Sequence, residues 1–125
     1  MPRVLIADDE ESMRTLVARA IAMDGHAIVT AEDGAEALEI LTRENGAFDL
    51  LLTDIKMPVM DDIALALAVA RDFPDLTILL MTGFADQRER AHGLNAIVHD
   101  VVTKPFSVAD IRTAVADALA AKKAG

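Results

Sequence analysis

Short apolar runs recur along this chain, and segments with helical periodicity separate them. The predicted strands cover residues 4–7, 27–31, 48–53, 76–81 and 97–103. Strands that are apolar along most of their length, without a clear alternation, are typical of a parallel sheet covered by helices on both faces. The sequence therefore predicts an α/β fold in which a β-α unit is repeated five times around one doubly wound parallel sheet.

Capping signals and turn residues mark the predicted helices. The first has an apolar stripe at helical spacing and ends at Gly25; the stripe consists of Met13, Leu16, Val17, Ala20 and Ile21. Asp33 lies three residues before Glu36, a capping-box spacing that predicts a second helix ending at Gly46. Ser107 is the predicted N-cap of the last helix. The remaining helices are predicted over residues 62–72 and 84–93.

Length and composition restrict the classes of function. A chain of 125 residues fits one domain, and we expect a single domain over residues 1–125 with no output domain. A net charge of −9 argues against binding to nucleic acid or anionic membranes. The chain has no cysteine, which excludes disulfides and thiolate metal sites. No apolar stretch is long enough to cross a bilayer, so we expect a cytoplasmic location with no membrane partner.

Residues suited to phosphoryl chemistry follow four of the five predicted strands. They are Asp8, Asp9, Asp54, Thr82 and Lys104. Because the carboxyl ends of parallel strands lie at one edge of a sheet, these side chains are expected to converge. Three carboxylates placed together repel one another unless a cation offsets them, and magnesium prefers oxygen ligands. The pattern predicts a magnesium site beside a phosphoryl group.

Each of these residues, taken alone, also has an ordinary structural explanation. Acidic residues after a strand commonly cap the next helix or are simply solvated. Thr82 could be a buried hydroxyl bonded to nearby backbone, and Lys104 could be a surface cation. The functional interpretation rests on their joint occurrence at four strand ends.

The chain resembles a response-regulator receiver domain of two-component signalling along essentially its whole length. The residues that carry the resemblance are Asp8-Asp9, Thr53 to Asp61, Thr82 to Ala85 and Lys104-Pro105-Phe106. The resemblance implies a flavodoxin-like fold with a five-stranded sheet in the order 2-1-3-4-5.

The resemblance also implies a role for each site residue. Asp54 would accept a phosphoryl group from a histidine kinase or a histidine phosphotransfer protein. Asp9, Asp54 and the backbone carbonyl of Lys56 would bind Mg²⁺, for which Mn²⁺ could substitute, and Asp8 would bind it through water. The implied phosphoryl contacts are Thr82 and Lys104. Such a domain is not an enzyme beyond catalysing its own phosphorylation and dephosphorylation.

Two positions depart from the family's pattern. Asp62 stands where, in the family, a glycine usually follows the motif Met-Pro-x-Met-Asp. The loop that contains this motif is therefore expected to bend differently or to begin its helix earlier. Val101 stands where an aromatic switch residue usually lies, and we expect Phe84 to take part of that role. The segment 84–93, the fifth strand and the last helix are expected to form the face that binds a downstream protein.

Two stretches look most like stand-alone bacterial receivers of the CpdR type, which are phosphorylation-controlled adaptors in cell-cycle proteolysis. They are residues 50–58 and 81–85. A monomer or weak dimer is expected, and a phosphorelay shuttle is the alternative within signalling. From another class, a Mg²⁺-dependent phosphohydrolase could use Asp54 as nucleophile, but Lys56 stands where dehalogenase-like phosphatases carry a second aspartate. A flavin-binding electron carrier is disfavoured because the chain has no Trp or Tyr.

Overall fold

The computed structural model describes residues 2–54, 60–82, 100–103 and 106–124. Of residues 60–65, 82, 100, 101, 103 and 122–124, only the backbone is described. The predicted helix over residues 84–93 and the predicted strand residues 97–99 lie outside the described part of the chain.

A parallel sheet of five strands forms the centre of the molecule. The strands are β1 (Arg3–Ala7), β2 (Ala27–Ala31), β3 (Leu50–Asp54), β4 (Thr77–Thr82) and β5 (Asp100–Thr103). Their order in the sheet is β2-β1-β3-β4-β5, and every neighbouring pair is parallel. The predicted fold class and strand order are therefore confirmed.

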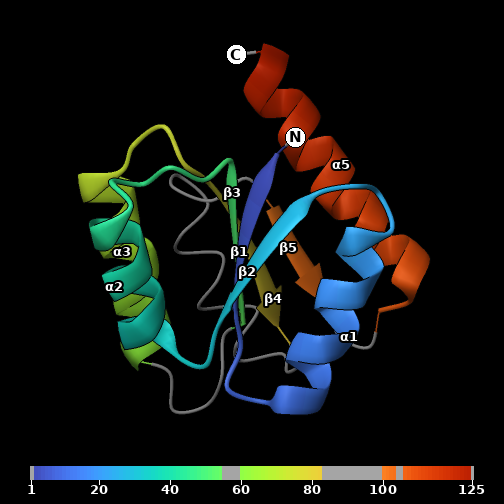
Figure 1. Cartoon of the computed structure of the whole chain (residues 1–125), viewed down its shortest axis with the longest axis horizontal. Helices are drawn as coiled ribbons and strands as arrows, with labels where there is room; N and C mark the ends of the chain where they lie inside the picture. Colours follow the sequence, from blue (N-terminus) through green and yellow to red (C-terminus); the bar gives the residue numbers. More distant parts are fainter. Residues whose placement is uncertain (1, 55–59, 83–99, 104–105, 125) are drawn as a thin grey trace.

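Helices cover both faces of this sheet. They are α1 (Glu11–Ala22), α2 (Gly34–Arg43), α3 (Met60–Asp72) and α5 (Val108–Ala124). Figure 1 shows α2 and α3 packed on one face and α1 and α5 on the other. Within the described ranges, no helix is both long enough and apolar enough to cross a membrane.

Alternate residues of each strand supply two separate apolar layers, because successive side chains of a strand point to opposite faces. In β1, Leu5 and Ala7 pack toward α2 and α3, whereas Val4 and Ile6 pack toward α1 and α5. All four are at most 2% exposed. Each large side chain buried in this way contributes about 1.5–3 kcal/mol relative to an exposed one.

Side-chain caps fix the starts of two helices. The Asp33 carboxylate accepts a 2.8 Å hydrogen bond from the backbone N–H of Glu36, as the capping-box spacing predicts. Ser107 accepts from the N–H of Asp110, and Asp110 accepts in return from the N–H of Ser107, both at 3.0 Å. The predicted Ser107 cap is thus confirmed, and its partner Asp110 is a finding of the structure.

The observed β3 begins two residues later than predicted. Phe48 is 4% exposed, but its N–H donates to the carbonyl of Gly46 in a turn that precedes the strand. The guanidinium of Arg3 lies 4.3 Å from the centre of the Phe48 ring. Phe48 therefore packs into the apolar layer beneath α2 and α3 from a turn that precedes β3, and its apolar character does not mark a strand residue.

Candidate functional site

The acids predicted to act together come from two neighbouring strands. Asp54 is the last residue of β3, and Asp8 directly follows β1. Ala7 lies opposite Thr53 in the β1–β3 register, so Asp8 and Asp54 occupy neighbouring positions at the carboxyl edge of the sheet. This arrangement follows directly from the parallel pairing of two apolar strands.

The carboxylates of Asp8, Asp9 and Asp54 form an acidic cluster. One oxygen of each lies within 4.8 Å of the corresponding oxygens of the other two. Asp8 and Asp54 are each only 2% exposed, whereas Asp9 is exposed. Buried carboxylates this close together cost free energy unless positive charge offsets them. An all-oxygen donor set with one side open to solvent fits a hard divalent cation such as Mg²⁺.

The turn between β1 and α1 holds Asp8 through several hydrogen bonds. Its N–H donates to the carbonyl of Ala31 at 3.2 Å, and its carboxylate Oδ1 accepts from the N–H of Glu10 at 2.9 Å. Nη1 of Arg14 donates to the Asp8 carbonyl oxygen at 2.8 Å. These contacts fix both the backbone and the side chain of Asp8 before α1 begins at Glu11.

The remaining predicted site residues are described only in part. Thr82 is the last residue of β4 and lies opposite Thr103 of β5, so its backbone reaches the same edge of the sheet as Asp54. Val101 lies within β5 opposite Leu80. Lys56, Phe84 and Lys104 lie outside the described residues.

The start of α3 shows where Asp62 lies, the residue that stands in place of the family's usual glycine. The helix begins at Met60, so Asp62 is a helical residue and not part of the preceding loop. The sequence placed the start of this helix at residue 62, so the helix begins two residues earlier than predicted.

Two residues near the cluster were not predicted from the sequence. Arg14 contacts Asp8 through a backbone carbonyl, and the only signal for it was a basic residue early in the helix that follows the acidic pair. Thr53 is fully buried, and its Oγ1 has no hydrogen-bond partner among the described residues. Because successive strand residues alternate, the Thr53 side chain lies on the sheet face opposite to that of Asp54.

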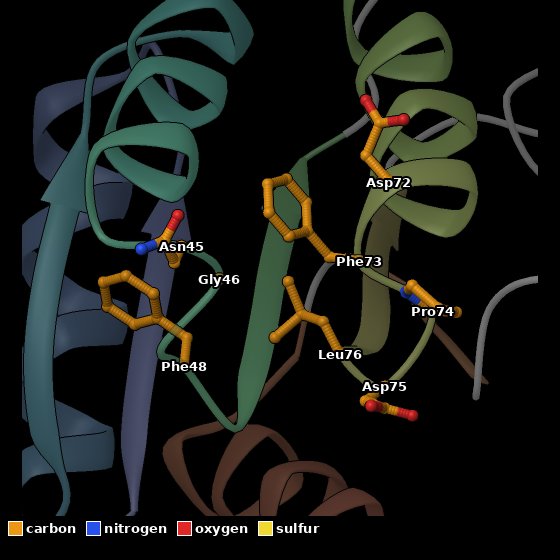
Figure 2. A pocket seen from close by; sticks show the side chains of 8 residues that line it. All are labelled: Asn45, Gly46, Phe48, Asp72, Phe73, Pro74, Asp75 and Leu76. Atoms are coloured by element: carbon orange, nitrogen blue, oxygen red, sulfur yellow. The ribbon is translucent and has the colours of Figure 1, made fainter.

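A cavity of about 250 Å³ lies at the opposite edge of the sheet, between the turns that precede β3 and β4. Figure 2 shows the residues that line it, among them Phe48, Phe73 and Leu76. None of the acids of the cluster lines this cavity. The predicted chemistry therefore belongs to the carboxyl edge of the sheet and not to this cavity.

Comparison with known proteins supports the same assignment. The family model for the response regulator receiver domain matches residues 4–116. The response regulator receiver protein CpdR of Brucella abortus is 38% identical over 111 residues, which are 89% of this chain and 91% of that protein. The probable transcriptional regulator ycf27 of Guillardia theta is 34% identical over 113 residues, covering 90% of this chain and 43% of that protein.

A solved structure shares both the fold and part of the sequence. The response regulator TrrA of Thermotoga maritima, crystallised in complex with Mg(2+)-BeF, superposes with a TM-score of 0.80 at 29% identity. The match covers 94% of this chain and 98% of that one. The chain spans less than half the length of several curated relatives, ycf27 among them. With its sheet order, its acidic cluster and the family match over residues 4–116, the chain belongs to the response regulator receiver domain family of two-component signalling.

Proposed function

We propose that this protein is a phosphorylation-activated switch in which Asp54 accepts a phosphoryl group from a histidine kinase or a histidine phosphotransfer protein. The observation that carries the proposal is the acidic cluster, with carboxylate oxygens within 4.8 Å of one another at the carboxyl edge of the sheet. Asp54 is the member of the cluster at the end of the central strand β3.

The chemistry is a displacement at phosphorus. A carboxylate oxygen of Asp54 attacks, an acyl phosphate bond forms, and the bond from phosphorus to the donor's histidine nitrogen breaks with its electron pair left on that nitrogen. Hydrolysis by water later returns the free carboxylate and inorganic phosphate. No separate substrate is turned over, so the protein is proposed not to act as an enzyme on other molecules.

The cluster's role is to place the nucleophile and to hold a cation beside it. Asp9 and Asp54, with the Lys56 carbonyl, would hold Mg²⁺ directly, and Asp8 would hold it through water. When bound, the cation neutralises charge on the transferring group. The complex of TrrA with Mg(2+)-BeF supports Mg²⁺ as the cation. Mn²⁺ is proposed as a substitute.

Thr82 and Lys104 complete the proposed phosphoryl site. Thr82 ends β4, the strand next to β3, so its backbone lies at the edge where Asp54 lies. The role of Lys104 rests on the resemblance of Lys104-Pro105 to the family motif.

The output is proposed to be phosphorylation-dependent protein binding through β5, α5 and residues 84–93. Two to three charge-assisted hydrogen bonds at about 1.5–3 kcal/mol each can supply the roughly 5.5 kcal/mol that inverts a 1:99 equilibrium. The likeness to CpdR covers 91% of that protein and favours a stand-alone adaptor over a phosphorelay shuttle. The resemblance of the sequence to receivers of the CpdR type suggests that such an adaptor acts in cell-cycle proteolysis. A cytoplasmic location and a monomer or weak dimer belong to the same proposal.

Intact mass spectrometry tests the central step. The protein is incubated with acetyl phosphate and Mg²⁺, beside a magnesium-free sample and the variant Asp54→Asn. A single phosphoryl increment that disappears in both controls is the expected result. Consumption of the donor without an increment would mean that the acyl phosphate is hydrolysed faster than it forms, as in a phosphohydrolase. Neither increment nor consumption would leave a receiver fold used only for binding.

A further inference from the structure

Arg14 is held against the turn that carries the acidic cluster. It lies in the first turns of α1, where its N–H donates to the Glu10 carbonyl at 2.9 Å, and its side chain is half-buried. From there Nη1 reaches back to donate to the carbonyl oxygen of Asp8 at 2.8 Å. The guanidinium charge is therefore fixed beside a residue whose own carboxylate belongs to the cluster.

A fixed positive charge at this place has opposite effects on two states of the site. Without a bound cation, a guanidinium held against the backbone of Asp8 would attract the nearby carboxylates of the cluster and reduce the cost of holding them together. With a divalent cation bound, the same guanidinium repels it. A contact through a partly buried hydrogen bond keeps this charge in place, whereas an ordinary surface arginine samples many positions.

We propose that Arg14 is a resident counter-charge of the acidic cluster, which stabilises the metal-free protein and lowers its affinity for Mg²⁺. This inference rests on the proposed function, since it takes the cluster to be the Mg²⁺ site. Arg14 would then set the Mg²⁺ concentration at which the receiver becomes competent for phosphorylation. It is a positioning and tuning residue, because it acts through the cluster and not on the phosphoryl group.

A purely structural role for Arg14 predicts the opposite sign. If the guanidinium mattered only for the shape of the turn, its loss would disorder Asp8 and weaken Mg²⁺ binding. The turn is, however, also held by two other hydrogen bonds. The N–H of Asp8 donates to the Ala31 carbonyl, and the N–H of Glu10 donates to the Asp8 carboxylate. Because these two bonds do not involve Arg14, the loss of its charge should dominate over the loss of its hydrogen bond.

The two consequences are linked by a thermodynamic cycle. A substitution that destabilises the metal-free protein more than the Mg²⁺-bound protein must tighten Mg²⁺ binding by the corresponding factor. For one unit charge close to a divalent cation in a partly solvated site, the factor is roughly three- to tenfold at low ionic strength. It should shrink as salt is raised toward 1 M, where the screening length falls to about 3 Å.

Calorimetric titration with MgCl₂ tests the proposal on the wild type and four variants. Arg14→Gln removes the charge but keeps a hydrogen-bond donor, and Arg14→Lys keeps the charge. Arg19→Gln removes an exposed cation from the last turn of the same helix and serves as the matched control. Asp9→Asn removes one cluster carboxylate and shows that the titration reports on this site.

The expected result is that Arg14→Gln binds Mg²⁺ three- to tenfold more tightly at low salt, while Arg14→Lys and Arg19→Gln stay close to the wild type. Urea unfolding with and without Mg²⁺ should show that Arg14→Gln lowers the free energy of unfolding more in the metal-free protein than in the Mg²⁺-bound protein. Unchanged or weaker Mg²⁺ binding by Arg14→Gln overturns the inference but leaves the proposed function intact. A wild type that binds no Mg²⁺, or an Asp9→Asn variant that binds it equally well, overturns the proposed metal site and this inference with it.

Discussion

The guanidinium of Arg112 in α5 donates two hydrogen bonds, of 2.6 and 3.1 Å, to the carboxylate of Asp24. Asp24 lies in the turn between α1 and β2, so the pair joins two segments that are 88 residues apart in the sequence. The hydrogen bonds from Arg112 and its charge, with a smaller effect of His26, hold the pKa of Asp24 below its ordinary value of 3.8. The ion pair therefore links stability to pH.

The first prediction concerns Arg112→Met. Because the pKa of Asp24 is lower in the folded protein than in the unfolded chain, the pair stabilises the fold above pH 3.8 and loses its effect as the pH falls through the folded-state pKa. Arg112→Met should thus lower the free energy of unfolding at pH 7 by a small amount, since both side chains are about one third exposed. Urea unfolding at pH 7 and at a pH below the folded-state pKa of Asp24 measures the loss of stability and its disappearance.

The control for this prediction is the same substitution in an Asp24→Asn background. There the partner carboxylate is absent, so Arg112→Met should change stability little at any pH. An equal loss in both backgrounds would mean that the alkyl chain of Arg112, and not its charge, carries the effect.

The second prediction concerns Gly46, which follows α2 with φ +68°. A Cβ at this position would lie 2.5 Å from Cδ1 of Phe73, whose ring is shown beside Gly46 in Figure 2. Gly46→Ala should cost about 1–2 kcal/mol for the left-handed backbone alone, with a further cost for displacing the ring. The free energy of unfolding from urea titration measures the sum.

Gly25 offers a matched control for the steric part. Its φ is +82°, and nothing lies within 4 Å of the Cβ that alanine would add. Gly25→Ala should therefore show the backbone cost only. If the two alanine variants were equally destabilised, the contact between the turn after α2 and Phe73 would have no energetic role.

Much of the fold was predictable because it depends on local pattern. Runs such as Val4–Ala7 are apolar throughout, and that pattern specifies parallel strands buried on both faces. Once the strands are parallel, the residues that follow them must share one edge, so the convergence of Asp8 and Asp54 follows from sequence position alone. The cap at Ser107 was predictable for the same reason, since its hydrogen bond spans only three residues.

What was not predictable depends on packing between distant segments. Phe48 is as apolar as its strand neighbours, and only the hydrogen bond from its N–H to the Gly46 carbonyl shows that it belongs to a turn. The pairing of Asp24 with Arg112 requires α1 and α5 to lie side by side on one face of the sheet. Arg14 donates to a backbone carbonyl, and a basic residue early in the helix does not by itself indicate such a contact.

The third prediction concerns the buried hydroxyl of Thr53. Its Oγ1 lacks a hydrogen-bond partner within the described ranges, and the residue lies between Ala7 and Leu80 in the sheet register. A buried hydroxyl without a partner costs about 1–3 kcal/mol, and valine has nearly the same shape. Thr53→Val should therefore raise the free energy of unfolding by up to this amount in a urea titration. Thr53→Ser keeps the hydroxyl and removes the methyl group, so it should lower stability, and a gain with serine would contradict the explanation.

The last prediction separates the charge of the acidic cluster from its chemistry. Asp54→Asn removes one of two nearly buried carboxylates while keeping the shape of the side chain. In the absence of divalent cations it should raise the free energy of unfolding by about 1–4 kcal/mol, the repulsion between two unit charges roughly 4 Å apart near a protein surface, because that repulsion is relieved. In saturating Mg²⁺ the order should reverse, since the wild type gains binding free energy that the variant largely loses. Urea unfolding of both proteins in EDTA and in MgCl₂ gives all four values. A gain that persists unchanged in MgCl₂ would show that Asp54 is not a ligand, because the stabilisation would then be independent of the cation.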